Sequence, residues 1–310
     1  MSYRIHPAAL ALALPLAIAC GKGEPEATVE QPSAQVRPAS TSITAPGSAG
    51  PGGPVTAVAI AEPAPTTYEA SEEALRAGDY DAARRGFEAY TGRKPENAWG
   101  WYMLGYSSWK AGDPEGALVA FDSALARDPR HLKSLYNSGR VLLDVGRPRE
   151  ALDRLQAAVE VDSSAAEGWR LLGRSFQAIG DGEAAVSAYR QALVLDEHDA
   201  WALNNLGVLY LHEGMAKDAI GPLARAVEVR PASPVFRNNL GSALERAGYP
   251  AAAKAAYANA VAADSGYAKA KGNLERVSAL VPEGTAPEID VAHAAEEFRF
   301  ALTVLRDGER

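Results

Sequence analysis

The sequence is poor in several features that define common classes of protein. Its 310 residues include one cysteine, Cys20, so no intramolecular disulfide can form. It has no excess of positive charge: the formal net charge is −8, which argues against a nucleic-acid-binding protein. The apolar run from Ala8 to Ile18 is too short to span a bilayer and contains Pro15.

Patterns for catalysis and metal binding are missing as well. No H-E-x-x-H, paired-cysteine, phosphate-loop or G-x-S-x-G pattern occurs. The histidines are scattered along the chain: His6, His131, His198, His212 and His293. Gly180-Asp181-Gly182 lacks the spaced carboxylates of a calcium loop. We therefore expect no enzymatic activity, cofactor, metal or small-molecule substrate.

What the sequence does contain is a regular internal repeat. Glycine recurs six times at one constant spacing: Gly78, Gly112, Gly146, Gly180, Gly214 and Gly248. Five positions after each glycine stands an alanine: Ala83, Ala117, Ala151, Ala185, Ala219 and Ala253. Four positions further on stands a large side chain: Phe87, Phe121, Leu155, Tyr189, Leu223 and Tyr257. A constant period of this length indicates one supersecondary unit copied along the chain.

The second unit shows what is repeated. Its sequence predicts two helices, at about 99–111 and 114–127, which are separated by Gly112 and followed by Pro129. Gly105 and Ala117 are small at the positions where the two helices would pack closely. A single hairpin of this size cannot bury its apolar face, so the copies must stack on one another.

The repeat resembles the tetratricopeptide repeat (TPR) family. The W-x-x-L-G pattern of that family is present as Trp101-Leu104-Gly105, as Trp169-Leu172-Gly173 and, with leucine in place of tryptophan, as Leu203-Leu206-Gly207. The closing proline of the family repeat is present as Pro95, Pro129 and Pro231, whereas Ser163, Glu197 and Ser265 depart from it.

The resemblance implies an all-α TPR superhelix, that is, an α-solenoid of helix–turn–helix repeats. Six repeats are expected within 67–267, at about 64–97, 98–131, 132–165, 166–199, 200–233 and 234–267. The first is atypical, with Ser71 in place of a glycine, as terminal repeats usually are. A capping helix is expected at 268–280, where Glu275 replaces the glycine.

The N-terminus resembles an export signal. Arg4 and the short apolar run predict a signal peptide over 1–19. Residues 16–21 resemble a bacterial lipobox, although Ala17 departs from its usual leucine, and Cys20 would then be lipidated. Residues 17–19 also fit ordinary A-x-A cleavage, which would leave a secreted protein with a free thiol. We favour lipidation, because a lone exported cysteine otherwise has no purpose.

Residues 20–66 follow as a segment rich in Pro, Ala, Gly, Ser and Thr, without aromatic residues. This composition predicts disorder, and therefore a lipid-anchored tether between a membrane and the repeats. Gly21 after the cysteine resembles outer-membrane sorting in some bacteria. We expect an exported, outer-membrane-anchored lipoprotein of the cell envelope that faces the periplasm.

The sixth position of each repeat is a candidate binding position. In TPR proteins that bind peptides, asparagine at this position holds the ligand backbone, because an amide both donates and accepts hydrogen bonds. The residues at this position are Met103, Asn137, Leu171, Asn205, Asn239 and, in the capping helix, Asn273. The resemblance therefore implies a partner-binding groove at Asn205, Asn239 and Asn273, with Asn137 beyond the break at Leu171. The alternative is that these amides bond to the neighbouring repeat.

Charged residues are expected on the same surface. The basic ones are Lys133, Arg140, Arg170, Arg174, Lys269 and Arg276. Glu167 and Glu245 oppose them, and Arg140 and Arg174 join the candidate groove residues. Such a surface suits an acidic segment or a C-terminal carboxylate of a partner. The alternative is an ordinary solvated face.

A linker is expected at 281–288, before an amphipathic helix that Asp290 would cap. Its apolar face comprises Val291, Ala294, Phe298, Ala301, Leu302 and Leu305. This helix would pack on the end of the array, or in its groove or that of a partner. As a whole, the sequence favours a non-catalytic scaffold that holds a protein or extended peptide in a concave groove. The alternative is a structural subunit or assembly factor that binds through the array ends or this helix.

Overall fold

The computed structural model describes residues 67–280 and 287–308 of the chain. The predicted signal peptide (1–19), Cys20, the segment 20–66 and most of the predicted linker at 281–288 lie outside the described residues. Within the described ranges, no helix is both long and apolar enough to cross a membrane.

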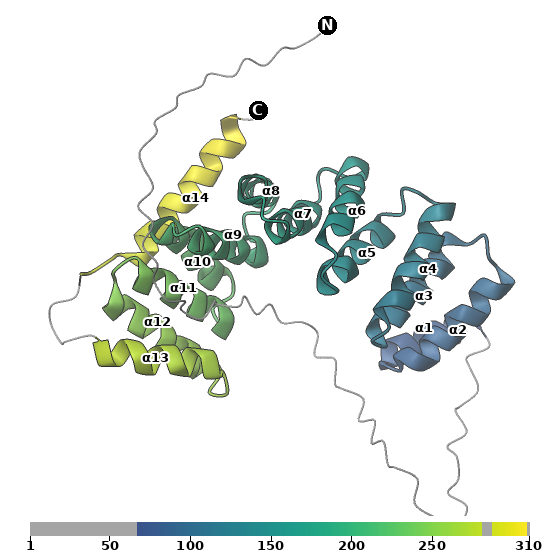
Figure 1. Cartoon of the computed structure of the whole chain (residues 1–310), viewed down its shortest axis with the longest axis horizontal. Coiled ribbons are helices and arrows are strands. Elements are labelled where there is room, and N and C mark those ends of the chain that lie inside the picture. Colours follow the sequence, from purple (N-terminus) through teal and green to yellow (C-terminus); the bar gives the residue numbers. More distant parts are fainter. Residues whose placement is uncertain (1–66, 281–286, 309–310) are drawn as a thin grey trace, which may run out of the picture. The chain divides into compact units, whose positions relative to one another are not determined.

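The described part of the chain is all-α, which confirms the predicted fold class (Figure 1). It contains fourteen helices and no strand: α1 (Tyr68–Ala77), α2 (Tyr80–Arg93), α3 (Ala98–Lys110), α4 (Pro114–Arg127), α5 (Leu132–Asp144), α6 (Pro148–Val161), α7 (Ala166–Ala178), α8 (Gly182–Leu195), α9 (Ala200–His212), α10 (Ala216–Val229), α11 (Pro234–Arg246), α12 (Pro250–Ala263), α13 (Ala268–Leu280) and α14 (Val291–Gly308).

Each hairpin turns at one of the six evenly spaced glycines. Gly112, between α3 and α4, has φ of +85°, a left-handed conformation that side-chain-bearing residues rarely adopt. The next residue, Asp113, caps α4, because its carboxylate accepts a hydrogen bond from the Gly116 N–H at 2.9 Å. The turn glycine and the cap together end one helix and begin the next.

The second set of glycines brings the two helices of a hairpin together. A Cβ on Gly105 would lie 2.6 Å from the Phe121 ring, so only glycine allows α3 to approach α4 this closely. Phe121 and Ala117 are completely buried there. The same contact recurs in the later repeats, where Gly139 faces Leu155, Gly173 faces Tyr189, Gly207 faces Leu223 and Gly241 faces Tyr257.

The hairpins stack in chain order, as expected of a solenoid. Each second helix packs against the first helix of the next hairpin, and from α3 onward successive first helices contact each other. Buried apolar side chains form one cluster from α2 to α8 and another from α8 to α14, and Trp169 and Phe176 of α7 pack against both.

The first helix, α1, begins one turn late. The other first helices begin at a constant spacing of one repeat, at Ala98, Leu132, Ala166, Ala200, Pro234 and Ala268. That spacing would place the start of α1 at residue 64, but α1 begins at Tyr68 with Thr67 as its N-cap. In place of the glycine of later repeats, Ser71 is fully buried and donates its hydroxyl to the Thr67 carbonyl at 2.9 Å.

The last helix, α14, packs against α10 and α8, which are second helices, and not against the surface of the first helices (Figure 1). A Cβ on Gly221 of α10 would lie 2.8 Å from the Phe298 Cβ, so this glycine permits the contact. Ala295 and Leu302 are buried in it. Ala301 and Leu305, which the sequence pattern placed on the same face, are exposed, although each lies seven positions after a half-buried residue of that face, Ala294 and Phe298 respectively.

Candidate functional site

The sixth-position asparagines form hydrogen bonds between adjacent repeats. The side-chain amide N–H of Asn239 in α11 donates to the side-chain carbonyl oxygen of Asn204 in α9 at 2.9 Å. The Asn273 amide of α13 donates in the same way to Asn238 of α11, also at 2.9 Å. Further toward the N-terminus, the Asn137 amide donates to the Tyr102 hydroxyl at 3.3 Å. At these three junctions the fifth position of one repeat accepts from the sixth position of the next, and we call these three bonds the amide ladder.

The exposure of these asparagines differs along the array. Asn137 and Asn205 are 7% and 3% exposed, so little of either amide faces solvent. Asn205 lies within hydrogen-bonding reach of the Tyr189 hydroxyl. Asn239 and Asn273 are half-buried, and the Asn273 carbonyl oxygen accepts from Arg276 at 3.2 Å. The bonding to neighbouring repeats is the alternative left open above, and only the last two asparagines also retain solvent exposure.

Leu171 interrupts the ladder at the fourth repeat. The fifth-position residue that would bond to it, Tyr136, is 9% exposed, and within the described residues its hydroxyl has no hydrogen-bond partner. Burial raises the pKa of the Tyr136 hydroxyl, as expected of a phenol removed from water. An unpaired buried hydroxyl costs stability.

The three central arginines of the surface are each paired with an acid of an adjacent helix or turn. Arg140 pairs with Glu167, Arg170 with Asp199 at 2.7 Å, and Arg174 with Asp144 at 3.7 Å. Burial lowers the pKa of Arg140, and the nearby Arg170 and Arg174 lower it further. Burial likewise raises the pKa of Asp144, against the effect of Arg174. The surface that we expected to be a basic groove therefore carries arginines whose positive charges are balanced by paired carboxylates.

A similar pair lies at the C-terminal end of the array. Arg276 of α13 binds the Glu245 carboxylate of α11, which also accepts from the Tyr257 hydroxyl at 2.9 Å. Burial acts to raise the pKa of Glu245, but the hydrogen bonds from Arg276 and Tyr257 outweigh it, so the pKa is lowered. This cluster ties α11, α12 and α13 together.

A row of aromatic side chains on α3 was not anticipated from the sequence. Trp99, Tyr102, Tyr106 and Trp109 follow one another at ring-centroid distances of 5.1, 6.2 and 6.2 Å, and we call them the aromatic stripe. Their spacing of three, four and three positions places them on one face of the helix. This spacing could have identified the stripe, but other half-buried apolar residues, such as Trp101 and Leu104, alternate with it.

Cations lie at both ends of the aromatic stripe. The Lys133 ammonium is 4.7 Å from the Trp99 ring centroid, and the Lys110 ammonium is 5.1 Å from that of Trp109. His131 packs beside Trp99 and caps α5, because its Nδ1 accepts from the Ser134 N–H at 3.3 Å. Burial lowers the pKa of His131. This capping role agrees with its place at a repeat junction.

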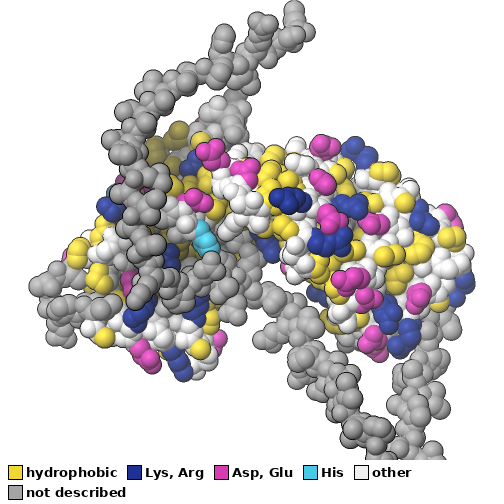
Figure 2. Space-filling view, in the orientation of Figure 1, with side chains coloured by type: hydrophobic (Ala, Val, Ile, Leu, Met, Phe, Trp, Pro, Cys, Tyr) yellow, Lys and Arg dark blue, Asp and Glu magenta, His cyan; other side chains and the backbone are white. Residues whose placement is uncertain are grey.

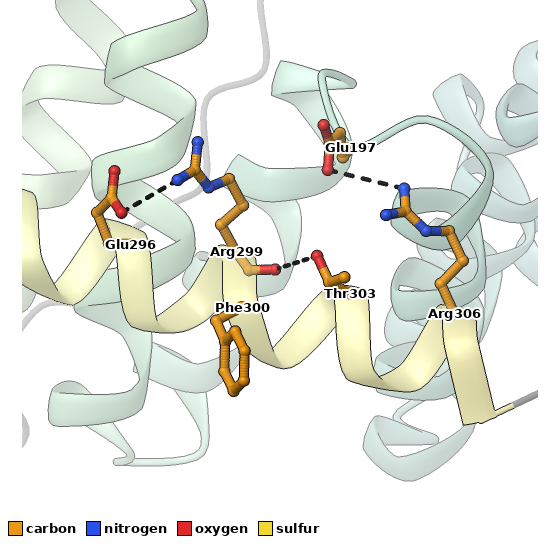
Figure 3. Close-up of a pocket in the computed structure, with 6 residues that line it drawn as sticks. All are labelled: Glu197, Glu296, Arg299, Phe300, Thr303 and Arg306. Atoms are coloured by element: carbon orange, nitrogen blue, oxygen red, sulfur yellow. Dashed lines mark hydrogen bonds and ion pairs between the residues drawn. The ribbon is translucent and has the colours of Figure 1, made fainter.

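Two hollows lie away from the predicted groove residues. One, of about 420 Å³, is lined by Glu197 and by five residues of α14: Glu296, Arg299, Phe300, Thr303 and Arg306 (Figure 3). In Figure 3, Arg306 reaches toward Glu197, at 4.0 Å, and Phe300 points away from Arg299. The other, of about 560 Å³, lies around Arg190, Tyr210 and Met215.

Neither hollow has the composition of a metal site, and in the described ranges no group of three or more His, Cys, Asp or Glu side chains could hold a metal ion. On the face shown in Figure 2, lysine and arginine side chains are interspersed with aspartate and glutamate. The surface chemistry is therefore that of mixed charges, an aromatic stripe and a few half-buried amides.

A family model described as "Tetratricopeptide repeat" matches residues 68–131, 136–199 and 170–235, together more than half of the chain. A comparison with curated proteins found no match.

Solved structures with the same fold include a MamA fragment from Desulfovibrio magneticus RS-1, with 24% identity and a TM-score of 0.50 over 53% of this chain and 92% of that one. The C-terminal part of a TPR repeat-containing protein from Cytophaga hutchinsonii has 15% identity and a TM-score of 0.57, over 69% of this chain and 86% of that one. YrrB, described as a TPR protein with an unusual peptide-binding site, has 20% identity and a TM-score of 0.50 over 62% and 100%. At these identities the likeness concerns the fold.

Proposed function

This chain belongs to the tetratricopeptide repeat family, and we propose that it is a scaffold that binds a partner protein or extended peptide along the surface of its first helices. TPR proteins generally mediate protein–protein interaction, and the fold is typical of non-catalytic scaffolds.

The observation that supports binding at the surface of the first helices is the solvent exposure of the last two ladder residues. Asn239 and Asn273 lie one repeat apart, and each uses its amide N–H group for the neighbouring repeat while staying half-exposed. An amide has two N–H donors and an acceptor oxygen, so each retains capacity for a peptide unit of the partner. The guanidinium of Arg276 beside Asn273 is already paired with Glu245, so the amides make the contacts to the partner. Asn137, Arg140, Arg174 and Asn205 then support the surface rather than contact the partner.

The test is photo-crosslinking in cells from position 239. A probe at Asn239 is expected to give a discrete adduct with one partner. A probe at Gln156, an exposed residue of the second helix α6, is the matched control and should give none. Equal adducts from both positions, or an adduct from 156 alone, would reject binding at the first-helix surface. Position 239 is preferable to Asn205, which is 3% exposed and would be disturbed by a large probe.

We place the scaffold at the bacterial cell envelope, anchored in the outer membrane through lipid on Cys20 and facing the periplasm. The support is the lipobox-like sequence before Cys20 and the tether-like composition of 20–66. Because two or more acyl chains anchor a protein stably, Cys20→Ser should move the protein from the membrane fraction to the soluble fraction. An unchanged distribution, or an intact mass without added lipid in the original protein, would contradict the anchor.

A second candidate function is that of a structural subunit that binds through α14. The supporting observation is that Phe300, Val304 and Leu305 are 71%, 55% and 40% exposed on this helix. The double variant F300S/V304S should then release the protein from its assembly, as read by native gel mobility. V119S, at a 67% exposed position of α4, is the matched control. Loss of assembly on mutation of Phe298 or Leu302 would be less informative, because both side chains pack against the array.

A further inference from the structure

The late start of α1 leaves Trp99, the first residue of the aromatic stripe, without a counterpart one repeat earlier. Equivalent residues of successive first helices lie side by side, as the contact between Lys133 and Trp99, one repeat apart in sequence, illustrates. The residue one repeat before Trp99 is Pro65, which precedes α1. Trp99 remains 39% exposed although its indole N–H donates to the hydroxyl of Tyr68, the first residue of α1, at 2.6 Å.

The stripe has the chemistry of a surface that binds proline. Trp99 is exposed and Tyr106 and Trp109 are half-buried, whereas Tyr102 between Trp99 and Tyr106 is 8% exposed. Aromatic rings in a row bind proline-rich segments, which lose little entropy because they are already extended in the polyproline II conformation. The lysines at the two ends, Lys110 and Lys133, favour an acidic residue within the segment.

The chain carries such a segment directly before α1. Residues 60–65 read Ile60-Ala61-Glu62-Pro63-Ala64-Pro65. The stripe runs over about ten residues of helix, or about 15 Å at 1.5 Å per residue. Five residue steps of polyproline II also cover about 15 Å, at 3.1 Å per step. The segment therefore matches the stripe in length, in apolar and proline content, and in charge.

We propose that residues 60–65 of this chain bind along the aromatic stripe, antiparallel to α3, with Pro65 against Trp99 and Ile60 toward Trp109. Because the segment is joined to α1, its effective concentration at the stripe is of the order of millimolar, so even a weak contact is occupied. The inference rests on the proposed function, since it assigns the N-terminal part of the first-helix surface to the chain itself. Partners are thereby directed to the C-terminal part, around Asn239 and Asn273.

The test uses the full-length mature protein with benzoylphenylalanine, a photo-crosslinking aromatic residue larger than tyrosine, in place of Tyr106. Irradiation is expected to link position 106 to residues 60–65 of the same chain, at a yield independent of protein concentration. The matched control is a probe at Ser242, the equivalent repeat position of α11, which should not link to 60–65. Absence of that link from position 106, or a link to another copy that disappears on dilution, would overturn the proposal.

A second variant separates the contribution of the prolines from that of proximity. P63A/P65A keeps the tether length but removes the rings that stack on the stripe, and it should lower the yield from position 106 at least about twofold. An unchanged yield would mean that mere proximity produces the link. The experiment needs no partner, so its failure is distinguishable from failure of the proposed function, which is read from position 239.

Discussion

The two ends of the first-helix surface use the same repeat positions for different chemistry. At the N-terminal end, the fifth position is Tyr102, part of an aromatic stripe with lysines beside it. At the C-terminal end, the fifth positions are Asn204 and Asn238, which accept hydrogen bonds from the next repeat. Since the helix pairs beneath are alike, the backbone of the repeat does not determine what the surface binds. The side chains at a few positions do.

The helix pairs at the two ends of the array are packed in the same way, and large-to-small substitutions in the core should therefore cost similar stability. Phe121 and Tyr257 fill equivalent positions beneath Gly105 and Gly241, and both are almost fully buried. F121A and Y257A should each lower the free energy of unfolding by about 3–5 kcal/mol, because each creates a cavity. Chemical denaturation of both variants measures the loss. A much smaller loss at one end would show that the ends do not share the same packing.

The outer faces differ because only the C-terminal repeats are covered by α14. Gly221 of α10 and Val119 of α4 occupy the same repeat position, but Gly221 contacts Phe298 whereas Val119 is 67% exposed. G221L should detach α14 or strain its contact at a cost of about 1–3 kcal/mol. V119L should be nearly neutral, because its side chain meets solvent. Hydrogen exchange of the α14 amides reads the difference, and unchanged protection in G221L would contradict the packing described.

The arrangement of helices was predictable because sterics dictate it locally. Only glycine can readily adopt the φ of +85° found at Gly112, and only glycine fits at Gly105 against Phe121. Both constraints recur at the same positions of successive repeats, so they are visible in the sequence. The family resemblance supplied the way in which hairpins stack.

The chemistry of the surface was less predictable, because it depends on pairs of residues that lie roughly one repeat apart in sequence. The partner of Asn239 is Asn204, the fifth-position residue of the preceding repeat, and no local pattern indicates that bond. The acid that compensates Arg170 is Asp199, at the end of its own repeat. The contact of α14 with α10 was not predictable either, because no local pattern indicates that Gly221 faces Phe298.

The finest difference lies between two tyrosines at the same repeat position. The Tyr102 hydroxyl accepts from Asn137, whereas the Tyr136 hydroxyl has no partner among the described residues because Leu171 stands where an asparagine would be. Y102F should lower the free energy of unfolding by about 1 kcal/mol, since it leaves the Asn137 amide without its acceptor. Y136F should leave it unchanged or raise it by up to about 1 kcal/mol, since it removes an unpaired buried hydroxyl.

Changes of opposite sign in the free energy of unfolding, a decrease for Y102F and none or an increase for Y136F, would distinguish a ladder from a set of incidental contacts. Urea denaturation of Y102F, Y136F and L171N measures it under identical conditions. L171N restores an amide beside Tyr136, so Y136F should become destabilising in the L171N background even if L171N itself costs stability through lost packing. A double-mutant cycle isolates this coupling from the packing loss. No coupling between positions 136 and 171 would mean that the fifth and sixth positions do not act as a pair, and the amide ladder would lose its role as the connection between repeats.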